Sequence, residues 1–351
     1  MNAIDFFCGG GGMTRGLLNA GINVLFGLDF DPSCQETYEN NNHIPYLCRD
    51  IHTVSAEDLI NEFPLLIEND ELLMIGCAPC QPFSSQRHSN REHVSVNLLD
   101  EFGRLVEALL PAHILIENVP GIQKRGQAVF NRFLELLDRL GYHYIYSAVN
   151  AKNYGVPQNR RRLILIASRL FEPHIPAPTH GNGLIPFTTV FDAIHNYPAL
   201  NAGEENPDVP NHRAANLIPI NLQRIMATPH NGGSRADWPQ HLHLNCHANG
   251  HNGHTDVYGR MVWDAVAPTL TSKCYSLSNG RFGHPEQNRA ISFREAAALQ
   301  SFRDDYVFWG NMQEMGRQIG NAVPVLLAES MGRYLLAEHN KFFYHYVNIE
   351  E

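Results

Sequence analysis

The 351-residue sequence has no apolar run that approaches the roughly 20 residues needed to cross a bilayer. It also lacks a basic leader followed by a cleavage site, because MNAIDFFCGG already reads as a strand that enters a glycine turn. Charged residues make up only 18% and hydrophobic residues 44%, a balance that disfavours disorder and supports a packed core. We therefore expect a globular cytoplasmic protein with no membrane partner.

Cysteine is sparse and irregular. The seven cysteines are odd in number and show no framework spacing, so they predict reduced thiols rather than a disulfide scaffold.

Basic charge is also scarce, with a formal net charge of −10. Residues 1–150 account for −10, whereas residues 151–275 carry +2 together with 10 of the 19 histidines. The acidic balance disfavours strong nonspecific DNA binding at physiological salt. Because the acid lies mainly in the first part, it does not exclude a groove elsewhere that meets a polyanion.

Apolar runs alternate with amphipathic stretches over the first half of the chain. The expected strands are Ala3–Phe7, Val24–Leu28, Leu72–Ile75, Ile114–Ile116, Tyr144–Val149 and Leu163–Ala167. The expected helices are Thr14–Ala20, Pro32–Asn40, Leu98–Leu110 and Gln127–Leu140. This alternation predicts an α/β fold: a mostly parallel, Rossmann-like sheet with helices on both faces.

From about Phe171 the composition shifts to Pro, Asn, His and Gly, and the periodicity fades until a helix expected at Ser292–Leu299. A last helix is expected at about Val323–His339. We therefore predict one domain from residues 1–184 and 293–351, and a smaller loop-rich domain from residues 185–292.

A glycine-rich turn, Gly9 to Gly12, follows the first strand and precedes a helix. Glycines let the backbone approach a ligand, although the spacing is neither G-x-G-x-x-G nor a P-loop. Asp29 ends the next strand and could accept hydrogen bonds from a ribose, and Phe30 beside it could cover an adenine. Asp50 follows a further strand as a second acceptor, and Ile51 beside it could form an apolar wall. The set describes an adenosine site without a pyrophosphate cradle, which suggests S-adenosylmethionine (SAM). The glycine run alone would equally fit a tight turn.

Cys80, in LLMIGCAPCQPFSSQ, follows the expected strand Leu72–Ile75 and lies in a proline-bounded turn. Open α/β sheets bind their ligands at the carboxyl ends of their strands. From its place alone Cys80 could be a nucleophile, a redox partner of Cys77, a metal ligand or a packing residue.

Polar residues also flank two later strands. Glu117 and Asn118 follow Ile114–Ile116, and an acid there could share a proton with a ring nitrogen. The segment QNRRR opens the strand Leu163–Ala167, and alternation would place Gln158, Arg160 and Arg162 on one face. Taken alone, Glu117 would more often be a surface residue and the arginines a solvated face.

Eight motifs in this order resemble those of the bacterial DNA cytosine-5 methyltransferase family. Residues 5–12 resemble its D-x-F-x-G-x-G-G loop, 29–30 its acidic-aromatic pair, Asp50 its adenine-side aspartate and 79–81 its nucleophile turn. Further along, 117–119 resemble its E-N-V, 158–162 its Q-x-R-x-R, 289–300 the segment after its recognition domain, and 318–323 its closing G-N motif. The match covers nearly the whole chain.

The resemblance implies that the larger domain binds SAM and methylates C5 of cytosine, and that residues 185–292 form the target recognition domain. Cys80 would attack C6 of a flipped-out base, Glu117 would stabilise N3 and Arg162 would donate to O2. Asn118 and Arg160 would orient Glu117 and the nucleophile turn, and the arginines would lower the pKa of Cys80 modestly. The implied cofactor contacts are Phe7, Gly9, Gly11, Gly12, Asp29, Phe30, Asp50, Ile51, Pro79, Leu98, Asn321 and Ala322.

The resemblance also implies double-stranded DNA as the substrate, a monomer, and a restriction endonuclease as a possible cognate partner. Residues 81–97 would form a loop that closes over the flipped base. The candidate DNA contacts are Gln81, Ser84, Ser85, Arg87, Gln158 and Arg235.

Other functions are weighed against this one. The C-x-x-C of Cys77 and Cys80 would suit a thiol-disulfide oxidoreductase, but Pro82 and the polar run after it do not open a helix as such motifs do. A catalytically inactive binding module and a transfer RNA methyltransferase remain as alternatives.

A histidine-rich segment raises the question of zinc, but its spacing fits no standard finger and we predict no metal. Its members are His241, His243, Cys246, His247, His251 and His254.

Overall fold

The computed structural model describes residues 1–67, 69–78, 97–244 and 255–347. The chain divides into two compact units. The sheet unit comprises Met1–Asn150, Arg161–Pro178 and Val325–Glu351, and the loop unit comprises Ala151–Arg160 and Thr179–Pro324.

A seven-stranded sheet, in the order β3-β2-β1-β4-β5-β7-β6, forms the centre of the sheet unit. Its strands are β1 (Asn2–Phe6), β2 (Asn23–Asp29), β3 (Tyr46–Cys48), β4 (Leu72–Gly76), β5 (His113–Asn118), β6 (His143–Asn150) and β7 (Arg161–Ser168). The first five pair in parallel, whereas β7 runs antiparallel to both β5 and β6. The predicted mostly parallel α/β sheet is confirmed.

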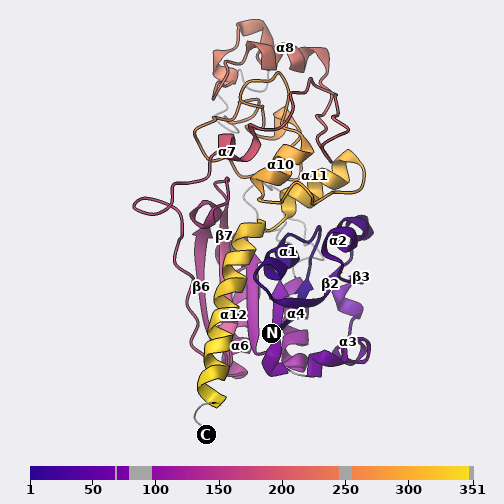
Figure 1. Ribbon diagram of the computed structural model, residues 1–351, viewed down its shortest axis with the longest axis vertical. Helices are drawn as coiled ribbons and strands as arrows, with labels where there is room; N and C mark the ends of the chain where they lie inside the picture. Colours follow the sequence, from indigo (N-terminus) through magenta and orange to yellow (C-terminus); the bar gives the residue numbers. More distant parts are fainter. Residues whose placement is uncertain (68, 79–96, 245–254, 348–351) are drawn as a thin grey trace. The chain divides into compact units, whose positions relative to one another are not determined.

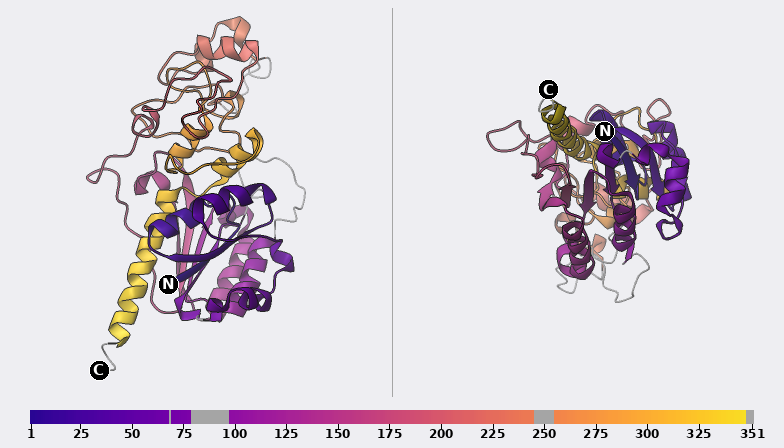
Figure 2. Two further views of the ribbon diagram at one scale, coloured as in Figure 1. Left: turned by 45° about the vertical axis from the view of Figure 1, so that its right-hand side comes forward. Right: turned by 90° about the horizontal axis from the view of Figure 1, so that it is seen from below.

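Helices cover both faces of this sheet (Figures 1 and 2). They are α1 (Gly12–Asn19), α2 (Gln35–Asn42), α3 (Ala56–Glu62), α4 (Leu98–Leu109), α5 (Ile122–Arg125), α6 (Gln127–Arg139) and α12 (Val325–Val347). Alternate residues of β1 explain the layers: Ile4 and Phe6 enter the apolar core that α4 and α6 also line. Asp5, between them, turns to α1, where its carboxylate accepts a hydrogen bond from Thr14.

Helices α1 and α12 lie against each other on that second face. A Cβ on Gly16 would lie 2.4 Å from the Cβ of Ala328, so only glycine permits this approach. The 23-residue helix α12 thus joins the C-terminal part of the chain to its first helix. Within the described residues, no helix is both long and apolar enough for a membrane span.

The loop unit contains little regular structure. Its α-helices are α7 (Val190–Ile194), α8 (Pro219–Ala227), α10 (Phe293–Leu299) and α11 (Met312–Asn321). Short 3-10 turns complete the described elements of both units: η1 (Pro32–Cys34), η2 (Ile51–Thr53), η3 (Pro64–Ile67), η4 (Asn69–Glu71), η7 (Ala151–Tyr154), η8 (Arg235–Asp237), η9 (Gln240–Leu242) and η10 (Leu277–Asn279).

Buried arginines hold the loop unit together by donating to backbone carbonyls. Arg260, fully buried, donates to the carbonyl oxygens of Thr228, Ile225, His284 and Gln287. Buried guanidinium groups require such partners, and each one cross-links several loops.

The boundaries of the two compact units differ from the predicted domain boundaries. Helices α10 and α11 belong to the loop unit, whereas the prediction grouped residues 293–351 with the larger domain. The functional assignment of each domain stays a prediction.

Candidate active site

The strand order of the sheet reverses between β1 and β4, which is the place where open α/β sheets bind ligands. Phe6 pairs with Gly76, and Gly76 pairs with Ile116. The chain therefore leaves β1 and β4 at the same edge, next to Glu117, the second-last residue of β5. The glycine loop and the segment that leads to Cys80 both begin at this edge of the sheet. Glu117 lies at the same edge.

The glycine loop after β1 needs its glycines. Gly9 and Gly11 have positive φ values of 49° and 81°, a region that favours glycine. A Cβ on Gly9 would find no atom within 4 Å, so this part of the loop is open to a ligand. The Gly9 N–H donates to Asp29 Oδ2 at 3.0 Å and thereby fixes the loop to the end of β2.

The residues predicted to bind adenosine lie around the ends of β2 and β3. Phe30 is 67% exposed, and burial raises the pKa of Asp29 despite its bonds to the N–H groups of Asp31 and Gly9. Asp50 accepts from the backbone N–H of His52, whose ring lies 2.7 Å away, and these bonds lower its pKa. Ile51 beside it is buried. Exposed aromatic surface, carboxylates and an open glycine suit an adenosine-containing cofactor.

A buried chain of polar groups beneath the glycine loop was missed by the sequence analysis. The Thr14 hydroxyl donates a hydrogen bond to Asp5 Oδ2 at 2.7 Å. The same hydroxyl lies 2.9 Å from the hydroxyl of Tyr38. Burial raises the pKa of Asp5 to about 7, although the bond from Thr14 opposes the rise. The only signal in the sequence is Asp5 itself, since nothing in the spacing predicts that Thr14 and Tyr38 meet it.

Glu117 and Arg162 form the ion pair at the crevice edge. Arg162 Nε lies 2.8 Å from Glu117 Oε1, and the side chains are only 13% and 10% exposed. The pairing register explains the contact: Glu117 opposes Ile164 across β5 and β7, and Arg162 lies two residues from Ile164 on the same face. Two residues that are 45 positions apart thus meet beside the crevice.

Asn118 links this pair to the segment that carries the predicted nucleophile. Its Nδ2 donates to the Ala78 carbonyl at 3.4 Å, and its Oδ1 accepts from the Val119 N–H at 2.8 Å. Cys77 is half-buried, and its backbone N–H donates to the Phe6 carbonyl at 3.2 Å. The predicted residues Pro79, Cys80, Gln81, Ser84, Ser85 and Arg87 lie outside the described residues.

Gln158 and Arg160 do not continue β7, because that strand begins at Arg161. The expected alternation of Gln158, Arg160 and Arg162 along one strand is therefore wrong. Arg160, 2% exposed, donates to the carbonyls of Leu270 and Ala322 at 3.1 Å each.

Gln158 was expected to contact DNA, but its side chain is fully buried. Its Nε2 donates to Leu299 O and to Gln300 Oε1, and its Oε1 accepts from the Leu270 N–H. Because both the nitrogen and the oxygen of this amide have partners inside the protein, Gln158 is better suited to positioning its neighbours than to contacting a DNA backbone.

The predicted cofactor residues near the C-terminal end are Asn321 and Ala322. Asn321 is exposed at the end of α11, and Ala322 is buried. A Cβ on the preceding Gly320 would lie 2.1 Å from the Thr271 carbonyl, so the glycine of this motif is required by backbone contact. Leu98, at the start of α4, packs partly buried against the sheet core.

Arg235 begins the short turn η8 of the loop unit and is half-buried. The preceding loop is held rigidly: Arg281 donates to the carbonyls of Gly232 and Gly233, and Asn231 accepts from the Trp263 N–H. A DNA contact by Arg235 stays a prediction.

Of the histidine-rich segment, the ring of His243 lies 2.9 Å from the Trp238 carbonyl. Cys246, His247, His251 and His254 lie outside the described residues, and within those described no cluster suited to a metal is found.

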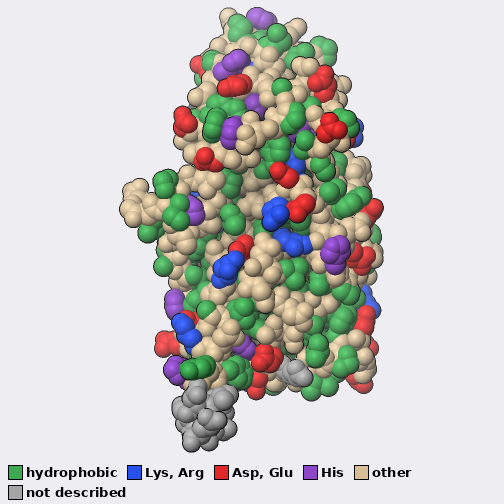
Figure 3. Space-filling model, in the orientation of Figure 1, with side chains coloured by type: hydrophobic (Ala, Val, Ile, Leu, Met, Phe, Trp, Pro, Cys, Tyr) green, Lys and Arg blue, Asp and Glu red, His purple; other side chains and the backbone are tan. Residues whose placement is uncertain are grey.

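On the face drawn in Figure 3, acidic and basic side chains are interspersed rather than gathered into one field of a single sign. A surface of this kind does not favour strong nonspecific attraction to a polyanion.

The sheet and its helices form an α/β methyltransferase fold, which solved methyltransferases share. A DNA modification methyltransferase encoded within an E. coli prophage superposes with a TM-score of 0.72 at 23% identity, covering 96% of this chain and 99% of that one. The S. pombe Dnmt2 methyltransferase gives a TM-score of 0.65 at 18% identity, covering 97% of this chain and 99% of that one.

The chain belongs to the C-5 cytosine-specific DNA methylase family, whose model matches residues 1–337. It is 43% identical over 350 residues to the type II methylase M.HgiDII of Herpetosiphon aurantiacus, covering 96% of this chain and 97% of the relative. It is 34% identical to the type II methyltransferase M1.HphI of Haemophilus parahaemolyticus, covering 95% and 86% respectively. The resemblance stated from the motifs is thereby confirmed.

Proposed function

We propose that this protein transfers the methyl group of SAM to C5 of a specific cytosine in double-stranded DNA. The observation that carries the proposal is the Glu117–Arg162 pair, which lies at the sheet edge where the chain also leaves β4 toward Cys80. An acid and a fixed cation at that edge suit a polar ring held beside a thiol.

The chemistry begins when the Cys80 thiolate adds to C6 of a flipped-out cytosine, and the ring electrons move toward C5. Glu117, in its protonated form, gives its proton to N3 of the ring and Arg162 donates to O2, so both groups stabilise the negative charge that develops. SAM, when bound, would supply a methyl group on a sulfonium, whose sulfur would keep the electrons of the broken S–C bond and leave as a neutral thioether. After C5 has taken the methyl group, loss of the C5 proton to a base and expulsion of the thiolate restore the aromatic ring.

The residues around the glycine loop support the choice of cofactor. The loop is open at Gly9, Phe30 is an exposed aromatic face, and Asp29 and Asp50 supply acceptors for ribose and adenine. Asn118 and Arg160 act as positioning groups, the first through Ala78 and the second through Ala322. The DNA is contacted by Arg235 and by Gln81, Ser84, Ser85 and Arg87.

We further propose that the protein is a cytoplasmic monomer and the modification enzyme of a restriction-modification system, with a cognate endonuclease. Its relatives M.HgiDII and M1.HphI are a type II methylase and a type II methyltransferase.

The test measures labelled methyl transfer from SAM to mixed-sequence duplex DNA and, in parallel, to transfer RNA. We expect transfer to DNA, its abolition in Cys80→Ser, and near wild-type transfer in the matched control Cys77→Ser. Transfer to RNA alone would contradict the substrate. Equal loss in both serine variants would contradict the assignment of Cys80 as the nucleophile.

A further inference from the structure

The turn that carries Asp50 and Ile51 is held from a neighbouring helix. Asp50 caps η2 (Ile51–Thr53), and the chain leaves this turn at Val54. Two carbonyls of the turn accept from the same guanidinium nitrogen: Arg104 Nη2 lies 3.1 Å from Ile51 O and 2.9 Å from Val54 O. Arg104 belongs to α4, so a residue about 50 positions away bridges both ends of the turn.

Arg104 is itself fixed on its helix. Its Nε lies 2.9 Å from Glu101 Oε2, one turn earlier on α4. The opposite side of α4 is anchored in the sheet core by the buried side chains of Phe102, Leu105 and Val106. The Arg104 guanidinium therefore fixes the turn relative to helix α4.

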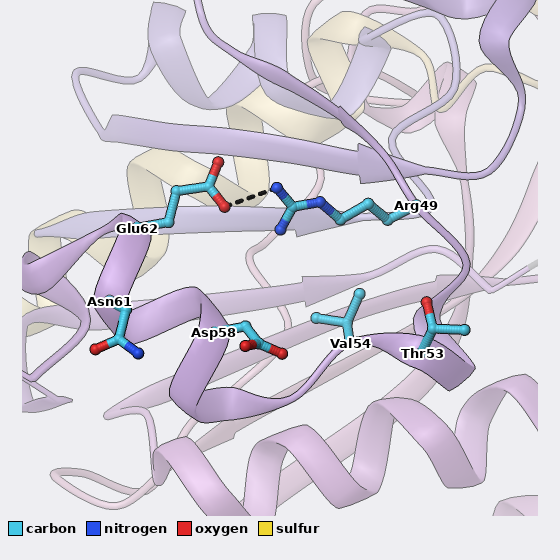
Figure 4. A pocket seen from close by; sticks show the side chains of 6 residues that line it. All are labelled: Arg49, Thr53, Val54, Asp58, Asn61 and Glu62. Carbon is cyan, nitrogen blue, oxygen red and sulfur yellow. Dashed lines mark ion pairs between the residues drawn. The ribbon is translucent and has the colours of Figure 1, made fainter.

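The turn borders solvent as well as protein. A polar hollow of about 560 Å³ runs beside it (Figure 4), lined by Arg49, Thr53, Val54, Asp58, Asn61 and Glu62. Figure 4 shows Arg49 directed toward Glu62, with which it forms an ion pair at 2.8 Å. Because this border of the turn is not filled by packed side chains, hydrogen bonds contribute more to its fixed geometry.

We propose that Arg104 is a positioning residue for the cofactor: it holds the Asp50–Val54 turn so that Asp50 and Ile51 meet the adenosine part of SAM. The inference rests on the proposed function, in which that turn contacts the cofactor. Helix α4 also begins with Leu98, a second predicted cofactor contact, so one helix orders two parts of the same binding site.

The test compares Arg104→Met, Arg104→Lys and the control Arg132→Met by equilibrium dialysis with labelled SAM, followed by the methyl-transfer assay. Arg132 is a suitable control because it pairs with Asp100 of the same helix at 2.6 Å but has no bond to the turn among those described. We expect Arg104→Met to raise the Kd for SAM roughly tenfold, as the loss of charge-assisted hydrogen bonds implies. The KM for DNA should change less than about twofold, since the bonds from Arg104 to Ile51 and Val54 hold the turn proposed to contact the cofactor.

Arg104→Lys should lie between wild type and Arg104→Met, because one ammonium can donate to both carbonyls from a shorter side chain. If Arg104→Met does not fold, the lysine variant decides: a raised Kd for SAM supports the proposal, and a wild-type Kd overturns it. In a folded Arg104→Met, an unchanged Kd for SAM, or an equal rise in the KM for DNA, also overturns it. Failure of the proposed function would differ, since wild-type protein itself would transfer no methyl group.

Discussion

Glu117 of the sheet unit and Glu295 of the loop unit both pair with an arginine, yet their surroundings differ. Glu117 meets Arg162 at 2.8 Å at a crevice edge, and both side chains retain some exposure. Glu295 meets Arg289 at 2.7 Å through two parallel hydrogen bonds, and both side chains are fully buried. Under the proposed function the first pair meets the substrate, whereas the second lies wholly inside the fold.

The same difference extends through the two units. The sheet unit is stabilised by strand pairing and by an apolar core. The loop unit contains buried arginines, among them Arg160, Arg260, Arg289 and Arg294, whose donors satisfy backbone carbonyls. A chain with few strands must satisfy its buried backbone in another way, and guanidinium groups with five donors serve that need.

The largest effect is expected on activity. Replacing Glu117 with Gln should lower kcat for methyl transfer by roughly 10²- to 10⁴-fold, the usual contribution of a proton-sharing group. The free energy of unfolding should fall by less than about 2 kcal/mol, because Gln keeps a polar oxygen beside Arg162 and both side chains retain some exposure. Single-turnover kinetics and urea unfolding measure the two quantities. A variant with wild-type kcat would remove Glu117 from the chemistry.

In the loop unit we expect a loss of stability rather than a loss of activity. Glu295→Gln leaves Arg289 without its buried counter-charge and should destabilise the protein by about 3–5 kcal/mol. Activity per folded molecule should be retained at low temperature. The matched control is Glu329→Gln, whose surface pair with Arg333 on α12 should cost less than about 0.5 kcal/mol. Similar losses in both variants would mean that burial does not separate the two pairs.

The pH dependence of stability should separate the units as well. Burial raises the pKa of Asp5 to about 7, so the folded state keeps a proton that the unfolded chain loses above about pH 4. Stability from this group is present at low pH and is lost, at about 1.4 kcal/mol per pH unit, as pH rises toward 7. Asp5→Asn should remove that slope, and urea unfolding at pH 5, 6 and 7 measures it.

His284 in the loop unit should act in the opposite direction. Burial lowers its pKa to about 4, against the attraction of Glu295, so the unfolded chain binds the proton first. Stability from His284 is present above about pH 6.5 and is lost as pH falls toward 4. An Asp5→Asn variant should therefore lose more stability between pH 6.5 and 5 than wild type does. Identical pH profiles would contradict the assignment.

The smallest effect concerns two close backbone contacts. Gly16→Ala in the sheet unit and Gly320→Ala in the loop unit would each bring a Cβ within 2.6 Å of a carbonyl oxygen, and we expect a cost of about 1–3 kcal/mol for each. Only Gly320→Ala should also weaken SAM binding, because Asn321 and Ala322 follow it directly. Thermal unfolding and equilibrium dialysis provide the comparison, and equal effects on SAM binding would contradict it.

The sheet unit could largely be predicted because its strands are apolar runs of ordinary length. The runs at Leu72–Ile75 and Ile114–Ile116 lie within β4 and β5. The antiparallel direction of β7 could not be foreseen, since an apolar strand reads the same in either direction. That direction nevertheless brings Arg162 to Glu117.

The loop unit was harder to predict for a physical reason. Hydrogen bonds from arginine to distant carbonyls leave no periodic trace in a sequence, so neither the cradle around Arg260 nor the burial of Gln158 was visible. Helix α10 was the exception, because its start is marked by the capping pair Ser292 and Glu295. The bonds from Arg104 to the Asp50–Val54 turn were also not predicted, because an arginine at this position of α4 is typical of any amphipathic helix.

The most direct measurement of the central claim is covalent trapping on duplex DNA whose cytosines are replaced by 5-fluorocytosine. Once C5 carries a methyl group and fluorine, no C5 proton remains to be lost, so the Cys80 thioether at C6 should persist. The account predicts a SAM-dependent, denaturation-resistant protein–DNA complex for wild type and Cys77→Ser, and none for Cys80→Ser. A complex that survives in Cys80→Ser, or that is absent from a wild-type protein active on normal DNA, would contradict it.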